Sequence, residues 1–337
     1  MTILGIETSC DETSAAVLQD GIVKSNVISS QLAHGEYGGV VPELASRAHQ
    51  RLIVPVVEEA LRTAGIGKDQ LDAVCATYGP GLMGALLVGL NFAKAMAYGL
   101  RVPFVGVNHM EAHLYSNFID EPKPNLPFLC LTVSGGHTQL VLVRNILEHE
   151  LLGETLDDAA GEAYDKVAKM LGLGFPGGPV LDRLAQAGNP DFVKFPRSLL
   201  GDESLDFSFS GIKTAVRYWL RDHPSSGDGE PNPAADRLND LCASFQAAMA
   251  DVLVEKILRG LKRTGVNDVA IAGGVSANSE LRRRLETLAA RRNFRLFVPK
   301  LGYCTDNGAM IAMTGYLLLK KGIESAFDLH AEPNLPL

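Results

Sequence analysis

The chain has 337 residues, of which 46% are hydrophobic and 21% charged, and its formal net charge is −8. This length suits two domains, and the composition is that of an ordinary globular protein rather than a disordered chain. An acidic chain does not attract nucleic acid as a whole, so any such contact must come from a local basic patch or a partner subunit.

The first third of the chain predicts a sheet followed by alternating helices and strands. Short apolar runs between polar turns favour three consecutive antiparallel strands, and later apolar residues recur at helical spacing. Asn108 is placed to cap a helix that begins at His109. In chain order we predict strands at 3–6, 15–18 and 22–28, a helix at 42–64, a strand at 73–77, a helix at 81–98 and a strand at 104–107.

The same order of elements starts again after the proline-rich linker at 120–127. Because two strand–turn–strand units stand about 125 residues apart, we predict a duplicated α/β unit with the active cleft between the copies. Two unrelated α/β domains are the alternative. The later elements are strands at 128–133, 139–143, near 151–152, 268–272 and 294–298, and helices at 161–171, 179–187, 209–221, 234–263, 276–290 and 306–320. Segment 222–236, rich in Pro, Gly, Ser and Asp, predicts a mobile surface loop.

Three turns of small or polar residues lie at strand ends, at 8–13, 134–138 and 272–278. Glycine lets backbone N–H groups approach an anion, and a helix N-terminus adds a favourable dipole. One such turn is usually a plain tight turn, but three in a duplicated unit favour a bound nucleotide. The sequence contains no P-loop motif. Asp11 and Glu12 in the first turn either orient a metal, an amine or a water, or belong to a solvated turn.

Two histidines, His109 and His113, stand four residues apart, which places both rings on one face of a helix. A metalloprotease would have glutamate directly after the first histidine, but here Met110 holds that place and Glu111 follows. We therefore reject a peptidase. Asp306 is the candidate third ligand, and two histidines with one carboxylate suit iron(II), with zinc as the alternative. Packing of the rings at a domain seam is the competing interpretation.

A basic segment contrasts with the acidic chain. Between Glu255 and Lys300 there are 11 Lys and Arg residues against 4 Asp and Glu. Residues 282–284 and 291–292, all arginine, are candidates for contact with a phosphate backbone. A solvated helix face with i, i+4 charge pairs is the alternative.

The compartment is predicted from what the sequence lacks. The five cysteines form no CxxC pair, which favours a reducing compartment over a disulfide framework or a structural zinc site. The first residues, MTILGIETSC, have no basic segment followed by an apolar core. We find no apolar run that approaches about 18 residues. We therefore expect a cytoplasmic protein with no signal peptide and no membrane span.

The motifs together identify a family. In order they are 6–13 (IETSCDET), 38–47 (GGVVPELASR), 79–82 (GPGL), 109–113 (HMEAH), 133–138 (VSGGHT), 157–163 (DDAAGEA), 207–211 (FSFSG), 273–278 (GGVSAN) and 304–309 (CTDNGA). With them the chain, from about residue 2 to 325, closely resembles the TsaD family of bacterial tRNA N6-adenosine threonylcarbamoyltransferases. The resemblance implies two ribonuclease-H-like halves of the actin, heat-shock-chaperone and sugar-kinase (ASKHA) superfold. A first lobe at 1–120 and 307–330 would hold the metal histidines, and a second lobe at 128–306 would hold the adenylate-binding turns.

The resemblance also implies a reaction. The threonylcarbamoyl group would pass from threonylcarbamoyl-AMP to N6 of adenosine 37 in tRNAs that read ANN codons. His109, His113 and Asp306 would hold one Fe²⁺ per subunit, with zinc or another divalent metal as the alternative. Asp11 or Glu12 would help remove the N6 proton. The residues expected to line the adenylate are Thr132, Val133, Ser134, Gly135, Gly136, Asp165, Gly178, Asp182 and Asn278. A paralogous non-catalytic subunit and a small ATPase subunit would be partners.

Two other members of the same superfold remain as alternatives. An ATPase or sugar kinase would need an aspartate on the first strand to place Mg-ATP, where this chain has Glu7 and Thr8. A non-catalytic scaffold subunit would need neither the histidine pair nor Asp306.

Overall fold

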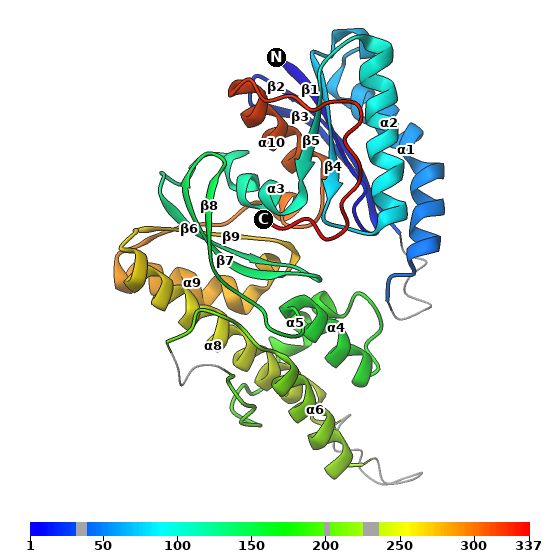
Figure 1. The fold of residues 1–337 in the computed structure, drawn as a ribbon. Helices are drawn as coiled ribbons and strands as arrows, with labels where there is room; N and C mark the ends of the chain where they lie inside the picture. The colour runs from blue at the N-terminus through cyan, green and yellow to red at the C-terminus, as the bar shows by residue number, and fades with distance from the viewer. Residues whose placement is uncertain (32–38, 199–202, 225–235) are drawn as a thin grey trace. The chain divides into compact units, whose positions relative to one another are not determined.

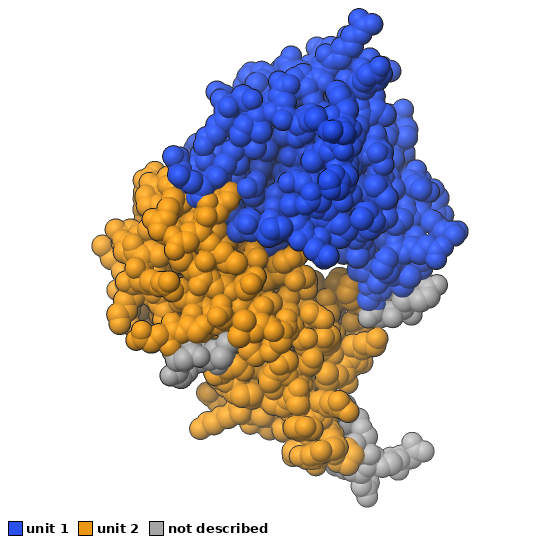
Figure 2. Space-filling model, in the orientation of Figure 1, with its two compact units in different colours: residues 1–124, 145–148, 299–337 blue, residues 125–144, 149–298 orange. Residues whose placement is uncertain are grey.

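The computed structural model describes residues 1–31, 39–198, 203–224 and 236–337. The chain forms two compact units, coloured separately in Figure 2. Unit 1 comprises residues 1–124, 145–148 and 299–337, and unit 2 comprises 125–144 and 149–298. Of the loop expected at 222–236, residues 225–235 lie outside the described part of the chain.

The two units contain sheets with the same strand order, which confirms the predicted duplication (Figure 1). In each sheet the first strand pairs antiparallel with the second and parallel with the fourth. Unit 1 has the order β3 (Ile22–Ser30), β2 (Glu12–Gln19), β1 (Thr2–Glu7), β4 (Ala73–Gly79), β5 (Phe104–Asn108). Unit 2 has β8 (Glu148–Glu154), β7 (Thr138–Asn145), β6 (Phe128–Val133), β9 (Asp268–Ala272), β10 (Arg295–Phe297).

The sheet of unit 1 is covered on both faces, because alternate residues of its strands point to opposite sides. Leu4 and Ile6 of β1 belong to the core beneath α1 (Pro42–Ala64) and α2 (Met83–Leu100). Ile3 belongs to the core on the other face. Helices α3 (His109–Tyr115) and α10 (Gly308–Lys320) cover that second face.

Helix α10 lies unusually close to the sheet, and two glycines allow it. A Cβ on Gly5 of β1 would lie 2.4 Å from the backbone N of Ala312 and O of Gly308. A Cβ on Gly308 would lie 2.6 Å from the backbone N of Ala16. Because neither backbone has room to yield, this contact fixes where α10 begins, and with it the position of Asp306 two residues earlier.

Unit 2 has one core, shared by the sheet and the helices α4 (Ala160–Met170), α5 (Gly177–Ala185), α6 (Ser210–Asp222), α8 (Leu238–Thr264) and α9 (Ser279–Arg292). Helix α9 begins later than expected because Asn278 is its N-cap and accepts a hydrogen bond from Leu281 N. Short 3-10 turns cover Lys68–Gln70, Ser116–Phe118, Gly274–Ala277 and Leu301–Tyr303.

The second unit ends at Val298, whereas the sequence placed the lobe boundary after Asp306. The intervening residues contact unit 1. Lys300 forms an ion pair with Asp120 at 3.1 Å, and Gly302 O accepts a hydrogen bond from Asn26. Asp306 therefore lies in the same unit as the two histidines.

The segment that follows α10 runs along the edge of the unit 1 sheet. Ser325 N donates to Phe104 O, and Gly106 N donates to Ser325 Oγ, both at 2.9 Å. Farther along, Asn108 Nδ2 donates to Pro336 O at 2.8 Å. Strand β5, which has no further strand beside it in the described sheet, is thus covered by residues 325–336.

The expectation that no apolar run approaches 18 residues is wrong for α2. This helix has 18 residues and a mean hydropathy of 1.3, so by length and composition it could cross a membrane. A core helix passes the same test, and α2 packs residues such as Leu86 and Leu90 into the core of unit 1.

Candidate functional site

The predicted histidine helix forms as expected, immediately after β5. Asn108 is its N-cap, and its Oδ1 accepts hydrogen bonds from Met110 N at 2.8 Å and Glu111 N at 3.4 Å. This cap starts the helix at His109, so His113 follows one turn later on the same face. The ring centroids lie 4.7 Å apart and the rings are nearly perpendicular.

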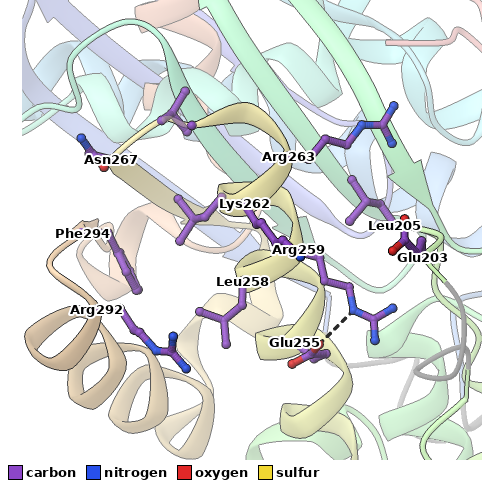
Figure 3. A pocket seen from close by; sticks show the side chains of 13 residues that line it. Glu203, Leu205, Glu255, Leu258, Arg259, Lys262, Arg263, Asn267, Arg292 and Phe294 are labelled. Atoms are coloured by element: carbon purple, nitrogen blue, oxygen red, sulfur yellow. Dashed lines mark hydrogen bonds and ion pairs between the residues drawn. The ribbon is translucent and has the colours of Figure 1, made fainter.

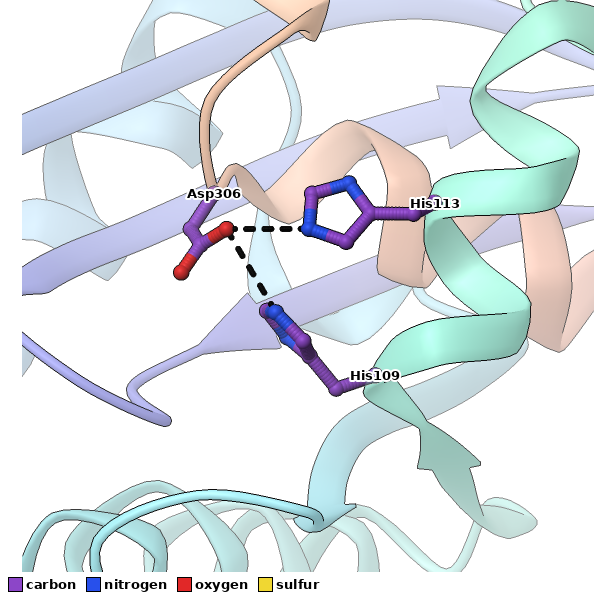
Figure 4. Close-up of side chains that lie close together, drawn as sticks. All are labelled: His109, His113 and Asp306. Carbon is purple, nitrogen blue, oxygen red and sulfur yellow. Dashed lines mark ion pairs between the residues drawn. The ribbon is translucent and has the colours of Figure 1, made fainter. Parts of the chain in front are cut away.

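Asp306 meets both rings, although it is almost two hundred residues away in the sequence (Figure 4). Its Oδ1 lies 3.4 Å from His109 Nε2 and 3.1 Å from His113 Nε2. One ligand atom from each of the three residues lies within 4.8 Å of the others. Ligands that sit about 2.1 Å from a shared ion lie roughly 3–4 Å apart, so the two pairs with Asp306 already have a suitable spacing.

The buried state of His113 supports a cation at this point. The residue is fully buried, and neither ring nitrogen has a hydrogen-bond partner among the described residues. The 3.1 Å approach of Nε2 to Asp306 is close, but it does not have hydrogen-bond geometry. A buried polar atom without a partner costs about 1–3 kcal/mol, and a bound ion removes that cost. Two imidazoles and one carboxylate fit a divalent transition metal and leave coordination positions for a substrate.

Glu7, at the end of β1, holds the other side of His109. Its Oε2 lies 3.0 Å from His109 Nδ1 and accepts a hydrogen bond from Thr77 Oγ1 at 2.5 Å. Ser9 N donates to the other carboxylate oxygen of Glu7. Because Nδ1 faces Glu7, Nε2 faces Asp306, and it offers a lone pair there once an ion takes the place of its proton.

The charges in this group depend on one another. Burial alone would raise the pKa of Asp306 and of Glu7, but His109 outweighs it and holds both values below their ordinary range. For His109 the balance is reversed: burial would lower its pKa, but Asp306 and Glu7 raise it well above the ordinary value. Two carboxylates around one imidazole favour a positive charge here, and either a proton or a cation supplies it.

Asp11 and Glu12 lie in the same unit, where the first turn leads into β2. Burial, followed by the negative charges of Asp306 and Asp11, raises the pKa of Glu12 to about 10. Burial also raises the pKa of the neighbouring Cys10 thiol far above its usual range. A nucleophilic thiolate is therefore disfavoured at Cys10.

The expected adenylate residues at the end of β6 lie in unit 2. Thr132 and Val133 are the last two residues of the strand, and Ser134 opens the turn. Ser134 is among the residues expected to line the adenylate, but its N–H donates to His137 O at 2.8 Å and closes the turn. A Cβ on Gly135 or Gly136 would meet no described atom within 4 Å, so these two positions are open.

Of the four remaining expected residues, one faces open space and three form hydrogen bonds within the protein. Gly178, near the start of α5, also faces open space. Asp165 Oδ1 accepts a hydrogen bond from Gly177 N at 2.8 Å. Asp182 Oδ1 accepts from Asn278 Nδ2 at 3.2 Å. The structure thus brings Asp182 and Asn278 together, and it ties Asp165 to the start of α5.

Asn278 connects three parts of unit 2 through one side chain. Its Nδ2 donates to Asp182 and also to Gln246 Oε1 at 2.9 Å, while its Oδ1 caps α9. Ser279 Oγ donates to Asp182 Oδ1 at 2.7 Å. Both polar atoms of Asn278 are therefore engaged within the protein, and it positions the turn at 272–278.

Sequence reasoning did not find Glu7 as a partner of His109. The available signal was a charged residue at the end of an otherwise apolar strand, since a fully buried glutamate requires a partner. Gln246 and Thr77 carried no signal of their own, because polar residues in a helix or a strand are common.

Comparison with known proteins gives full-length relatives. Residues 21–313 match the family described as "TsaD: tRNA N6-adenosine threonylcarbamoyltransferase". A tRNA N6-adenosine threonylcarbamoyltransferase of Salinibacter ruber is 56% identical over 338 residues, which cover 100% of both chains. The protein of that name from Cytophaga hutchinsonii is 52% identical and covers 99% of this chain and 96% of its own length.

Solved structures confirm the expected fold class at low sequence identity. HypF of T. kodakarensis aligns with a TM-score of 0.62 and 16% identity, over 96% of this chain and 48% of its own. Component A of the (R)-2-hydroxyglutaryl-CoA dehydratase of Acidaminococcus fermentans aligns with a TM-score of 0.53 and 15% identity, over 94% of this chain and 99% of its own. These likenesses show the actin-like fold alone.

Proposed function

The chain belongs to the TsaD family of tRNA N6-adenosine threonylcarbamoyltransferases, and we propose that its donor is threonylcarbamoyl-AMP. The enzyme transfers a threonylcarbamoyl group to N6 of an adenosine, so tRNA is its substrate. We assign the target to adenosine 37 of tRNAs that read ANN codons, and we place the protein in the cytoplasm. We also propose a paralogous non-catalytic subunit and a small ATPase subunit as partners.

The chemistry defines what the protein must provide. Adenosine N6 attacks the carbamoyl carbon and a C–N bond forms. The bond from that carbon to the phosphate oxygen breaks, and AMP leaves with the electron pair. N6 also loses a proton. Because the lone pair of N6 is delocalised into the purine ring, N6 is a weak nucleophile, and catalysis must come mainly from positioning and from stabilising negative charge.

The observation that carries the proposal is the convergence of His109, His113 and Asp306 around the unpartnered Nε2 of His113. We propose that the three side chains hold one divalent ion, with Fe²⁺ as first choice for this ligand set and zinc as second. When bound, the ion supplies Lewis-acid polarisation and a template for donor oxygens. Glu7 keeps the ring of His109 turned so that Nε2 is available.

The proton leaving N6 needs an acceptor, and Asp11 and Glu12 are the candidates in unit 1. Burial disfavours the charged form of Glu12, so we assign acceptance first to Asp11. Glu12 would then donate a hydrogen bond from its protonated carboxyl group.

We assign the nucleotide part of the donor to the turns of unit 2. The open faces of Gly135, Gly136 and Gly178 allow close approach of a phosphate to backbone N–H groups. Thr132, Val133 and Ser134 set the direction of the first turn. The carboxylates of Asp165 and Asp182 retain lone pairs beyond their hydrogen bonds to the chain, and these would accept from ribose hydroxyls. Asn278 holds its turn in place.

The structure gives no support to a kinase or ATPase as the second function. The position where such a protein would place Mg-ATP is Glu7, and its carboxylate is engaged by His109, Thr77 and Ser9.

In the experiment that tests the proposal, the chain is incubated with the adenylate, the partner subunits and tRNA, and the tRNA nucleosides are then analysed by mass spectrometry. We expect threonylcarbamoyl-adenosine. Its absence with the native protein, or equal formation with His113→Ala, would overturn the proposal.

A further inference from the structure

The structure separates the cations of the basic segment 255–300 into those with partners and those without. Seven of them have partners. Five pair with a carboxylate: Arg259 with Glu255, Arg283 and Arg284 with Glu280, Arg295 with Asp268, and Lys300 with Asp120. Lys256 and Arg282 donate to the backbone oxygens of Ser204 and Ser276. Four have no ion pair or side-chain hydrogen bond to any described residue: Lys262, Arg263, Arg291 and Arg292.

These four cations lie at the ends of two packed helices. Lys262 and Arg263 are in the last turn of α8, and Arg291 and Arg292 are in the last turn of α9. All four are exposed. In Figure 3, Arg292 from α9 and Lys262 from α8 lie on opposite sides of a hollow that Leu258 and Phe294 also line.

The hollow extends along both helices. A first part of about 1100 Å³ and a second part of about 710 Å³ share Glu255, Leu258 and Arg259 in their linings. We call the two parts together the basic trough. Eight Lys and Arg residues line it against three Asp and Glu residues, in a chain whose net charge is −8. The excess of positive charge is thus concentrated in one concave surface of unit 2.

We propose that the basic trough docks the phosphate backbone of tRNA, with Lys262, Arg263, Arg291 and Arg292 as the contacting cations. This rests on the proposed function, which makes tRNA the substrate. A basic, concave strip on an acidic protein attracts a polyanion locally, and each phosphate contact releases counterions. The inference also revises the sequence analysis: Arg283 and Arg284, proposed there as contacts, are held by Glu280.

A simpler role for these cations is to stabilise the negative ends of the α8 and α9 dipoles. The two roles predict different measurements. Loss of a dipole partner lowers thermal stability and leaves tRNA affinity unchanged. Loss of a phosphate contact lowers affinity and flattens its dependence on salt, with little effect on stability.

The test compares two double variants, Lys262→Gln with Arg263→Gln and Arg291→Gln with Arg292→Gln. The matched control is Arg144→Gln with Arg221→Gln, which removes two exposed cations of unit 2 that each pair with an acid and do not line the trough. Glutamine keeps good helix propensity. Binding of unmodified tRNA to the full chain, alone and with its partner subunits, is measured by fluorescence anisotropy from 50 to 300 mM salt.

We expect each trough variant to bind tRNA about tenfold more weakly at 150 mM salt, with the slope of log affinity against log salt reduced by about 1–2. The control should bind as the native protein does. Equal affinity and slope in all proteins, or no binding by the native protein, would overturn the inference. Trough variants that bind tRNA normally but no longer bind a partner subunit would also overturn the inference, because the trough would then be a protein interface. Native formation of threonylcarbamoyl-adenosine, measured separately, shows whether the proposed function itself stands.

Discussion

His109 Nδ1 lies 3.0 Å from Glu7 Oε2, although the two residues are 102 positions apart. The contact joins the end of β1 to the start of α3, so the ring is held from the sheet as well as from its own helix. When an ion replaces the proton at Nε2, the carboxylate at Nδ1 keeps the remaining proton there, so that the lone pair of Nε2 is available to the ion. The candidate metal centre is therefore built from four residues rather than three.

Glu7→Gln should weaken metal binding roughly 10- to 100-fold, the usual effect of losing such a supporting carboxylate. The ring of His109 would keep a partner of similar shape but lose the negative charge that makes Nε2 a better ligand. The change in metal affinity would be measured from the metal content of the purified protein and by calorimetric titration with Fe²⁺ or Zn²⁺. Thr77→Val is the matched control, since it removes only a hydrogen bond to Glu7 Oε2. Equal affinity in Glu7→Gln and native protein would contradict the assignment.

We expect a divalent ion to raise the Tm of the native protein, and His113→Ala should abolish both this rise and the stoichiometric metal content. His49→Ala, in the same unit, is the matched control. His49 is buried too, but its ring nitrogens contact Thr13 Oγ1 at 2.8 Å and Cys10 O at 2.9 Å. Its loss should cost about 1–3 kcal/mol of stability and leave metal content intact. A His113→Ala protein that still responds to metal would count against the centre.

Stability should depend on pH through His149 in β8. Burial lowers its pKa to about 4, while in the unfolded chain it titrates near 6.5. Between these values the unfolded state binds the extra proton, so His149 reduces stability as pH falls from about 6.5 to 4 and adds no further loss below that. Denaturant midpoints of the native protein and of His149→Gln, measured at several pH values, would isolate the contribution of His149 to the pH dependence of stability. If the two curves of midpoint against pH were parallel, His149 would make no such contribution.

Gly5→Ala should destabilise the protein by about 3 kcal/mol or more, because the new Cβ meets the backbone of α10 and not a side chain. The folded fraction should also bind metal more weakly, since a shift of α10 moves Asp306. Gly99→Ala is the control: it lies in α2, and a Cβ there meets nothing within 4 Å. It should raise stability by about 0.5–1 kcal/mol. Urea midpoints and metal titrations would compare the two variants.

Much of the fold could be predicted because each unit repeats a local pattern. The bounds of α1 and β6 agree with the sequence prediction, as the apolar periodicity in each begins and ends at a clear turn signal. The start of α9 was misplaced, because the 3-10 turn Gly274–Ala277 resembles a helical start until Asn278 caps the true one.

The site was predicted in part, and the division follows sequence distance. The His109–His113 pair is local, so spacing alone placed both rings on one face. The partner of Asp182 was not predictable, because Asn278 is 96 residues away and nothing in either segment indicates the other. Ser134 is an exception, because its N–H donates to His137 O only three residues along the chain, and the sequence does not indicate which amides the turn uses itself.

The segment from Ser325 to Pro336 has a consequence for solubility. It occupies outward-facing backbone groups of β5 at Phe104 and Gly106, which a bare sheet edge would offer to any passing strand. Removing it would expose an apolar edge strand and invite pairing between molecules. We therefore expect a chain that lacks this segment to aggregate before an effect on its enzymatic activity can be measured.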